Sequence, residues 1–379
     1  MDAQVAVIGT GSIGSMALWQ LARAGVSAIG FEQYGIAHDQ AAAGGESRIF
    51  RTAYLEGAEY VPILQRALGL WRELEAESGR DLLTLNGGLM IGHRDNEAMD
   101  NVMTSISEFG LSHEVLDADT MAARYPQHVM ASDETAILDH AAGLLRPEFA
   151  VAAAAYRART LGAELRSHER VLDVDATPGA VVVRTDKREY TAEQAIVTTG
   201  PWTYEYAPSL APHIGPRRLI MTWYQADDVS RWRPDVCPVF IRDSEDAHIF
   251  GIPTLDGGSV KVAPHTDDLD AAFDDADTLD RNVAVDDLRH INDAVARHLH
   301  GLTPEPVRVS AYMDGYTSDR HGIVGRAPDA DNVWLLGAFS GHGFKMAPAF
   351  GQIATDLVTS GATSLPVAHL DPARFAGTD

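Results

Sequence analysis

Lysine is rare in this chain of 379 residues, and two of its lysines stand in segments that could do chemistry. Only Lys187, Lys261 and Lys345 occur among the 30 basic residues, so arginine is used wherever a positive charge alone is enough. A flexible ammonium and a rigid guanidinium do different work in a buried site. Lys345 in SGHGFKMAP is therefore a candidate functional residue. Lys261 in GGSVKVAPH is a second one, although an exposed lysine on an expected strand is its simpler interpretation.

The segment VAVIGTGSIG, near the N-terminus, has the spacing of a dinucleotide site. Gly9, Gly11 and Gly14 follow the G-x-G-x-x-G pattern between an expected strand and an expected helix. The first glycine permits a tight turn, the second lets the backbone approach a pyrophosphate, and the third allows close packing. Glu32 ends the next expected strand and would accept hydrogen bonds from ribose hydroxyls. The pattern predicts a dinucleotide fold without separating NAD from FAD.

Two further motifs favour an anionic, planar ligand. Arg48 and Arg51 in ESRIFR are three positions apart and share a face if the segment is helical. Structural ion pairs are the simpler interpretation, but the glycines just before ESRIFR favour a cofactor or substrate anion, and arginine binds carboxylates bidentately. Gly341 and Gly343 let the backbone approach a planar ligand before an expected helix, whose N-terminus favours negative charge such as that of a reduced flavin.

The bulk properties exclude several kinds of partner. A formal net charge of −24 argues against nucleic acid and anionic membranes. The N-terminus has no basic start, and no run approaches the ~20 apolar residues that a membrane span needs. The single cysteine, Cys237, forbids an intrachain disulfide and fits a reducing compartment. His298 and His300, two positions apart on an expected helix, suit no metal. We therefore expect a cytoplasmic protein without a metal site.

Hydrophobic patterns predict an alternation of strands and helices. Helices are expected over residues 59–78 and 348–359. Strands are expected at 5–9, 28–32, 87–92, 170–174, 181–184, 195–199, 221–225, 239–241, 248–251, 259–263 and 332–337. The acidic stretch 267–287 is interpreted as a solvated, partly helical face without a function.

Seven motifs, in chain order, together resemble the family of monomeric sarcosine oxidase and of N-methyltryptophan, pipecolate and fructosyl amino acid oxidases. They are GTGSIG with Glu32, GGESRIFRTAYLEGAEYVP, GLLRP, TTGPW, VKVAPH, TSDRHGIVG and GAFSGHGFK. The resemblance implies an α/β fold in which a Rossmann-like FAD domain joins a second α+β substrate domain on a mixed, largely antiparallel sheet. The FAD domain would comprise 1–85, 145–216 and 320–379, and the substrate domain 86–144 and 217–319.

The resemblance also implies roles for single residues. Lys345 and Arg51 match the pair that grips the substrate carboxylate, and Arg48 matches an arginine close to the flavin ring. Lys261 matches the lysine that activates oxygen through a water molecule, and a fixed cation there favours electron transfer to oxygen. His265 matches a pocket histidine.

FAD itself would be held by residues from the N-terminal, central and C-terminal motifs. These are Gly9, Gly11, Ser12, Ile13, Gly14, Glu32, Ser47, Arg48, Val171, Thr198, Gly200, Trp202, Phe339, Gly341, His342, Gly343, Phe344 and Lys345.

The sequence departs from the family pattern at the cofactor and in the pocket. The cysteine that binds flavin covalently in some members would fall near Tyr312, so we expect non-covalent FAD. A histidine pair is replaced by Ala43 and Gly44, and an active-site tyrosine by Phe250. These changes leave the residues for carboxylate binding in place but alter the pocket around them. The substrate therefore need not be sarcosine itself.

The sequence thus predicts a monomeric FAD-dependent oxidase of a secondary or N-substituted amino acid, with oxygen as the acceptor and hydrogen peroxide as a product. The flavin carries the redox step, while the protein supplies orientation and electrostatics. Three alternatives stay open at this point. They are a related dehydrogenase with another acceptor, an NAD-linked amino acid dehydrogenase, and a degenerate flavoprotein that serves as a binding partner.

Overall fold

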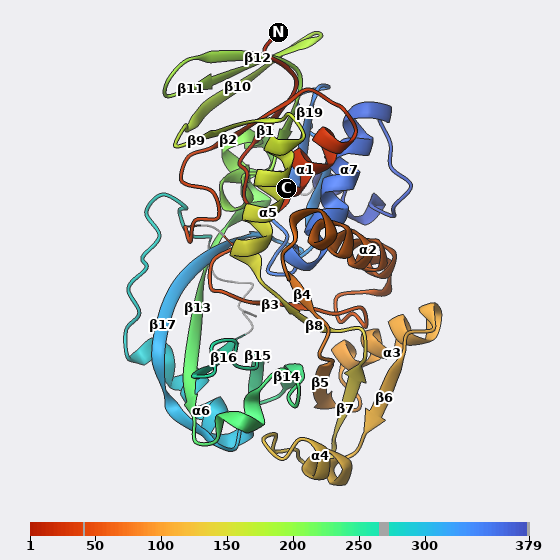
Figure 1. Cartoon of the computed structure of the whole chain (residues 1–379), viewed down its shortest axis with the longest axis vertical. Coiled ribbons are helices and arrows are strands. Elements are labelled where there is room, and N and C mark those ends of the chain that lie inside the picture. Colours follow the sequence, from red (N-terminus) through yellow and green to blue (C-terminus); the bar gives the residue numbers. More distant parts are fainter. Residues whose placement is uncertain (41, 265–272, 377–379) are drawn as a thin grey trace.

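A first large sheet, drawn in the upper half of Figure 1, contains the strand that leads into the predicted glycine motif and the strand that ends at Glu32. The computed structural model describes residues 1–40, 42–264 and 273–376. Within them this sheet has eight strands, and β9, β2, β1, β12 and β19 lie side by side in parallel. Its strands are β1 (Ala3–Ile8), β2 (Ala28–Glu32), β9 (Glu164–Ser167), β10 (Val171–Thr177), β11 (Ala180–Thr185), β12 (Glu189–Val197), β18 (Ile323–Arg326) and β19 (Val333–Gly337).

Helices cover one face of this sheet. α1 (Ser12–Arg23), α2 (Val61–Ser78), α5 (Pro147–Thr160) and α7 (Ala347–Ser360) bury their apolar sides in one core with Val5 and Val7 of β1. On the other face of the sheet, residues of the antiparallel β10 and β11 pack into a second hydrophobic core. A parallel strand buried on both faces is apolar throughout, which is why the apolar run VAVI could be predicted as a strand.

Local signals set the ends of these helices. Pro62 lies in the first turn of α2, where its missing N–H costs nothing, and Gly79 ends the helix with a left-handed φ of 66°. Gly361 ends α7 in the same way, with a φ of 76°. The helices predicted over 59–78 and 348–359 are thereby confirmed to within two residues.

A second large sheet forms the lower half of Figure 1. In the described residues it has eight strands in the order β17-β13-β16-β15-β14-β5-β7-β6, and all neighbours are antiparallel except β14 and β5. A mixed, largely antiparallel sheet is therefore confirmed. Its strands are β5 (Gly88–His93), β6 (His113–Leu116), β7 (Glu134–Asp139), β13 (Ile214–Ala226), β14 (Val239–Ser244), β15 (Ala247–Ile252), β16 (Ser259–Pro264) and β17 (Leu302–Thr317).

Smaller elements connect and flank the two sheets. A three-stranded sheet of β3 (Arg48–Phe50), β8 (Gly143–Leu145) and β4 (Leu83–Thr84) lies where the chain passes between them. The second sheet is flanked by α3 (Glu97–Phe109), α4 (Ala118–Arg124) and α6 (Arg289–His298). The short 3₁₀ helices are η1 (Ala58–Tyr60), η2 (Gly200–Tyr206), η3 (Pro208–His213), η4 (Val229–Trp232), η5 (Asp286–Leu288), η6 (Phe344–Met346), η7 (Ala368–Leu370) and η8 (Pro372–Phe375).

The division into an FAD domain (1–85, 145–216 and 320–379) and a substrate domain remains our proposal. It is supported by the strands, since the chain leaves the first sheet before β5, returns after β8, leaves again at β13 and returns at β18. Because the chain crosses between the two large sheets four times, residues of both sheets lie next to the small connecting sheet.

Two sequence predictions need correction. The segment from Arg48 to Arg51 is not helical, because β3 pairs with β8, so the two arginines do not share a helix face. The acidic stretch is partly helical as expected, since its described part contains the 3₁₀ helix η5. The strand expected at 221–225 is much longer, since β13 pairs with β17 along its whole length.

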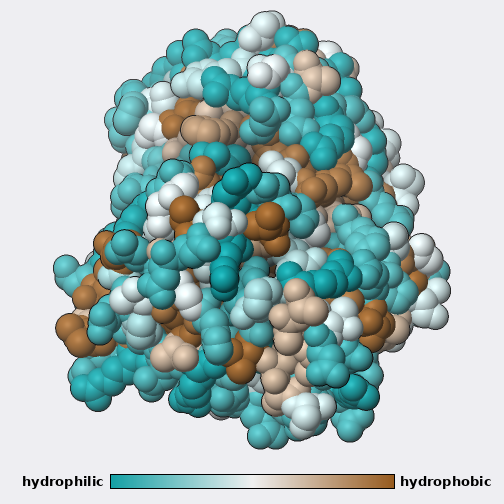
Figure 2. Space-filling model, turned by 60° about the horizontal axis from the view of Figure 1, so that its bottom comes forward, coloured by the Kyte–Doolittle hydropathy of each residue, from teal (hydrophilic) through white to brown (hydrophobic). Residues whose placement is uncertain are grey.

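The surface of the lower end is mostly hydrophilic. Figure 2 shows hydrophobic residues there in small groups among hydrophilic ones. No helix among the described residues is long and apolar enough to cross a membrane.

Candidate active site

The glycine motif forms the turn between β1 and α1, as predicted. Gly9 has a left-handed φ of 82° that permits this turn, and a Cβ on Gly14 would lie only 1.9 Å from the Gly9 carbonyl oxygen. A Cβ on Gly11, in contrast, would meet nothing within 4 Å. Gly11 caps α1 without a side-chain hydrogen bond, so backbone N–H groups at the helix start are available to an anion.

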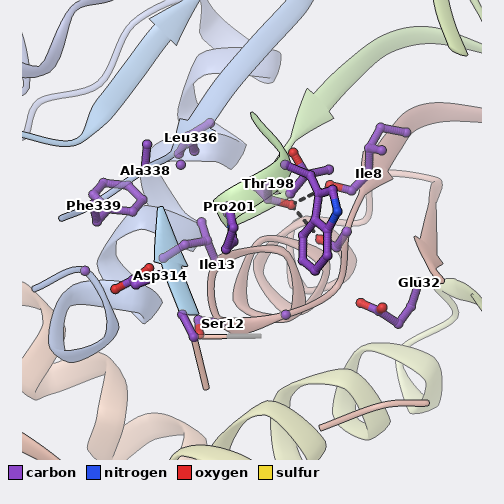
Figure 3. Close-up of a pocket in the computed structure, with 18 of the residues that line it drawn as sticks. Ile8, Ser12, Ile13, Glu32, Thr198, Pro201, Asp314, Leu336, Ala338 and Phe339 are labelled. Carbon is purple, nitrogen blue, oxygen red and sulfur yellow. Dashed lines mark hydrogen bonds between the residues drawn. The ribbon is translucent and has the colours of Figure 1, made fainter. Parts of the chain in front are cut away.

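Glu32, at the end of β2, presents its carboxylate beside this turn. It is 5% exposed and accepts hydrogen bonds from the backbone N–H groups of Thr10 (3.2 Å) and Tyr34 (3.0 Å). His38 lies 3.2 Å from the same carboxylate. Thr198, at the end of β12, closes the opposite wall, since its hydroxyl donates to the carbonyls of Ile8 and Gly9 (Figure 3).

A first pocket, with an empty volume of about 1040 Å³, extends from this turn. Figure 3 shows Glu32 at one end, with Asp314 and Phe339 toward the other. Of the residues predicted to hold FAD, the following line this pocket: Gly9, Gly11, Ser12, Ile13, Glu32, Arg48, Val171, Thr198, Gly200, Trp202, Phe339, Gly341, Gly343 and Phe344. The predicted residues Gly14, Ser47, His342 and Lys345 do not line it.

These features fit FAD. The open space at Gly11 and the uncapped start of α1 suit a pyrophosphate, while the Glu32 carboxylate suits ribose hydroxyls. The pocket also runs from the Glu32 end to Phe339 without interruption, as an extended dinucleotide requires.

Sequence reasoning missed Asp314, which lies on β17 and lines the first pocket. Its carboxylate accepts from the backbone N–H groups of Gly315 (2.8 Å) and Gly341 (3.1 Å). Burial raises the pKa of this carboxyl to about 6, against the opposing effects of those hydrogen bonds and of Arg48. A lone carboxylate in the otherwise uncharged run VSAYMDGYT was the available signal.

A second pocket, with an empty volume of about 1480 Å³, opens between the connecting sheet and the face of β14 and β15. Arg48, Gly341 and Phe344 line both pockets, so the two meet at these residues. The predicted clamp residues Arg51 and Lys345 line the second pocket, and so does Phe250. The structure therefore brings the proposed carboxylate clamp to the end of the first pocket that is remote from Glu32.

Arg51 is only partly paired. Its Nη2 donates to both carboxylate oxygens of Glu56, at 2.6 and 2.8 Å, but its buried Nε and Nη1 have no hydrogen-bond partner among the described residues. Buried guanidinium nitrogens are costly to leave unpaired. Nε and Nη1 point to different sides of the guanidinium, so each suits one ligand oxygen and the two cannot grip one carboxylate together.

Lys345 is buried beside Arg51. Its Nζ donates to the carbonyl of His342 (3.0 Å) and reaches the Tyr54 hydroxyl (3.4 Å). Burial, and next the positive charge of Arg51, lower its pKa to about 7. A neighbouring carboxylate would restore the charge on this ammonium.

Lys261 is on a strand, as predicted, but it is not exposed. It is 2% exposed on β16, and its Nζ donates to the carbonyls of Gly45 and Ser47, both at 3.0 Å. Burial and then Arg48 lower its pKa well below the ordinary lysine value. Lys261 lines neither pocket and lies behind the loop that leads into β3.

Arg48 supports the same loop from the other side, since its guanidinium donates to the carbonyls of Ser47, Ala42 and Gly44. The half-buried Arg48 and the buried Lys261 therefore hold this loop at the meeting point of the pockets. His265, the predicted pocket histidine, lies outside the described residues.

The described geometry agrees with comparisons to known proteins. Residues 4–357 match the family model "FAD dependent oxidoreductase". The chain is 34% identical to the monomeric sarcosine oxidase of Streptomyces avermitilis over 98% of this chain and 97% of the relative. It is 26% identical to the N-methyl-L-tryptophan oxidase of Salmonella enteritidis, over 99% of this chain and the whole relative.

Solved structures share the fold over nearly the whole chain. NikD, an amino acid oxidase of nikkomycin biosynthesis, has a TM-score of 0.86 at 21% identity and covers 98% of this chain and 97% of its own. The L-proline dehydrogenase of P. horikoshii has a TM-score of 0.82 at 22% identity, with 99% and 98% covered. The chain therefore belongs to the family of FAD-dependent oxidoreductases, and FAD is its cofactor.

Proposed function

We propose that this protein oxidises an amino acid whose amine is secondary or N-substituted, and that oxygen is reduced to hydrogen peroxide. The observation that carries this proposal is that Arg51, whose Nε and Nη1 have no partner among the described residues, lies with the Lys345 ammonium on the wall of the second pocket. The names of the sarcosine and N-methyl-L-tryptophan oxidases among its relatives support an N-substituted amino acid, and the word "monomeric" in the former supports a monomer.

The residues that would hold FAD are those of the first pocket, with the start of α1 at the pyrophosphate and Glu32 at a ribose. FAD supplies the acceptor for the hydride of the substrate and the means of passing its electrons to oxygen. We assign to the protein the binding, orientation and charge of the reacting amino acid.

Arg51 and Lys345 would fix the carboxylate of the substrate. Once it is bound there, the α-carbon and the amine face the shared residues Arg48, Gly341 and Phe344. The cations of this wall disfavour a positive charge on the substrate nitrogen, so they lower the pKa of the amine. A neutral amine is the form that can release a hydride from the adjacent carbon, so no side-chain base is required.

Lys261 and Arg48 would supply fixed positive charge close to the meeting point of the pockets, which favours electron transfer to oxygen. Because Lys261 lines neither pocket, a dehydrogenase with another electron acceptor is the second candidate function. The rate at which air reoxidises the substrate-reduced protein separates the two.

The test begins with the visible absorption spectrum of the purified protein before and after acid precipitation. We expect flavin bands in the supernatant, because Tyr312 stands where a covalent cysteine would be needed. Anaerobic addition of N-methyl and cyclic amino acids should then bleach the flavin, and air should restore its colour with release of hydrogen peroxide. A flavin that no amino acid bleaches would overturn the proposal.

A further inference from the structure

Tyr54 lies between the two cations of the proposed carboxylate clamp. Its side chain is fully buried. The centre of its ring is 4.8 Å from the Arg51 guanidinium carbon and 5.3 Å from Lys345 Nζ. One aromatic ring therefore contacts both charged groups, at distances at which a cation and an aromatic face attract each other.

The direction of the hydrogen bonds around Tyr54 follows from the chemistry of its neighbours. His342 Nε2 lies 3.0 Å from the backbone carbonyl of Arg320, which can only accept, so this nitrogen carries the hydrogen. Burial lowers the pKa of His342 to about 4, so its ring is neutral near pH 7 and its Nδ1 must accept. The Tyr54 hydroxyl, 3.1 Å away, therefore donates to Nδ1. Burial raises the pKa of Tyr54, which keeps that proton in place.

With its hydrogen committed to His342, the Tyr54 oxygen can only accept from Lys345. The Lys345 ammonium has three N–H groups. One reaches the Tyr54 oxygen at 3.4 Å, and a second donates to the His342 carbonyl at 3.0 Å. Lys345 also lines the second pocket, so the third N–H is left for a ligand there.

We propose that Tyr54, fixed by His342, is the positioning residue that orients Arg51 and Lys345 for the substrate carboxylate. The inference rests on the proposed function, in which these two cations bind a carboxylate. The Tyr54 ring sets the spacing of the cations, and its hydroxyl bonds to the charged form of the lysine. His342 thereby acts on the substrate through Tyr54, although the sequence had assigned it to the cofactor.

This arrangement predicts a pH dependence whose sign follows from the groups around Lys345. Those groups are Arg48 on β3, Arg51, Tyr54 and Glu56 in the segment after β3, Asp314 on β17 and His342 before η6. The ammonium is present below its pKa of about 7 and is lost above it, so carboxylate binding weakens as the pH rises through that value. Removing an acceptor of the charged form moves this transition to lower pH.

The experiment measures the dissociation constants of propionate and its uncharged analogue propionamide between pH 5.5 and 9, from the change in the flavin spectrum of the FAD-loaded protein. Tyr54→Phe keeps the ring and removes only the hydroxyl. Tyr60→Phe is the matched control, because the Tyr60 hydroxyl also bonds to a histidine, His321 at 2.7 Å, and its ring lies 5.3 Å from that of Tyr54.

In Tyr54→Phe we expect the propionate transition to move down by about one pH unit, which makes binding about tenfold weaker above both transitions. Tyr60→Phe should leave the transition where it is in the wild type. His342→Leu frees the Tyr54 hydroxyl to rotate and should shift the propionate transition in the same direction by a smaller amount. This variant tests the positioning role of Tyr54 if Tyr54→Phe does not retain FAD.

Unchanged transitions in Tyr54→Phe and His342→Leu, or an equal shift in Tyr60→Phe, would overturn the inference while leaving the carboxylate clamp intact. A wild-type protein that binds propionate no better than propionamide would instead overturn the proposed function. The two failures are therefore distinguishable from one set of titrations.

Discussion

Replacing Arg51 by methionine tests the carboxylate clamp most directly. Methionine keeps much of the buried hydrophobic stem, since Arg51 is 4% exposed, but removes all donors. In the wild type, Nη2 is occupied by Glu56, whereas Nε and Nη1 have no partner among the described residues. Nε and Nη1 point to different sides of the guanidinium, so a substrate carboxylate can accept from one of them while Nη2 stays with Glu56.

The size of the effect follows from the one free donor that can reach the carboxylate. A hydrogen bond to a charged group contributes about 1.5–3 kcal/mol, so its loss costs about that much. Since 1.36 kcal/mol is a factor of ten, kcat/KM should fall about 10- to 150-fold. The carboxylate does not react, so the loss should appear mainly in KM, with kcat nearly unchanged.

Glu56 provides an internal check on this reasoning. In Arg51→Met its carboxylate loses this ion pair and lies beside the incoming substrate carboxylate, so repulsion adds to the loss. The double variant Arg51→Met, Glu56→Gln should therefore recover part of the affinity. In a model without a clamp, the second substitution would have no reason to help.

The assay compares the best amino acid substrate with its carboxamide, by steady-state oxygen consumption and by anaerobic flavin bleaching. The wild type should prefer the acid, and Arg51→Met should lose that preference. Equal losses for acid and amide, or a fall in kcat with an unchanged KM, would refute the clamp and assign Arg51 a structural role.

Four further substitutions probe the cofactor site and its surroundings. Gly14→Ala should lower the melting temperature measured by calorimetry by about 5 °C, because the new Cβ would lie 1.9 Å from the Gly9 carbonyl oxygen. Gly11→Ala has room for its Cβ and should fold normally, but flavin titration should show FAD binding at least about tenfold weaker. Lys261→Met should slow the reoxidation of the reduced flavin by oxygen about tenfold or more in stopped-flow traces, but should not affect the anaerobic bleaching of the flavin by substrate. Slow reoxidation of the wild-type flavin would instead favour the dehydrogenase. Burial raises the pKa of Asp314 from 3.8 to about 6, so the folded protein loses stability as the pH rises between these values and keeps the full penalty above pH 6. Asp314→Asn should therefore stabilise the protein by about 1–3 kcal/mol at pH 8 and by less at pH 5, measured by denaturant unfolding.

The parts of the fold that the sequence predicted correctly are those with a local signal. A buried parallel strand, a glycine turn and a helix start depend on neighbouring residues, so β1, Gly9 and α1 could be predicted together. The length of β13 depends instead on pairing with β17, about 90 positions away by sequence number, which no local pattern contains. The mistaken helix at Arg48 has the same origin, since β8 makes that segment a strand.

The sequence proposes the residues of the candidate site, but it does not give their contacts. Lys345 and Arg51 were assigned to a carboxylate because of their motifs, and the structure places both on one pocket. His342 was assigned to the cofactor for the same reason, yet its ring points to Tyr54 and the Arg320 carbonyl. A motif gives the order of residues along the chain, whereas the direction of a side chain depends on which distant partner is within reach.

Two departures that the resemblance implies meet in a single packing contact. The resemblance places the covalent cysteine near Tyr312 and a histidine at Gly44, positions that are far apart in the sequence. A Cβ on Gly44 would lie 2.5 Å from a ring carbon of Tyr312, so a histidine at 44 and this tyrosine cannot occupy the same space. The tyrosine ring fills the volume against the loop that Arg48 and Lys261 hold at the meeting point of the two pockets.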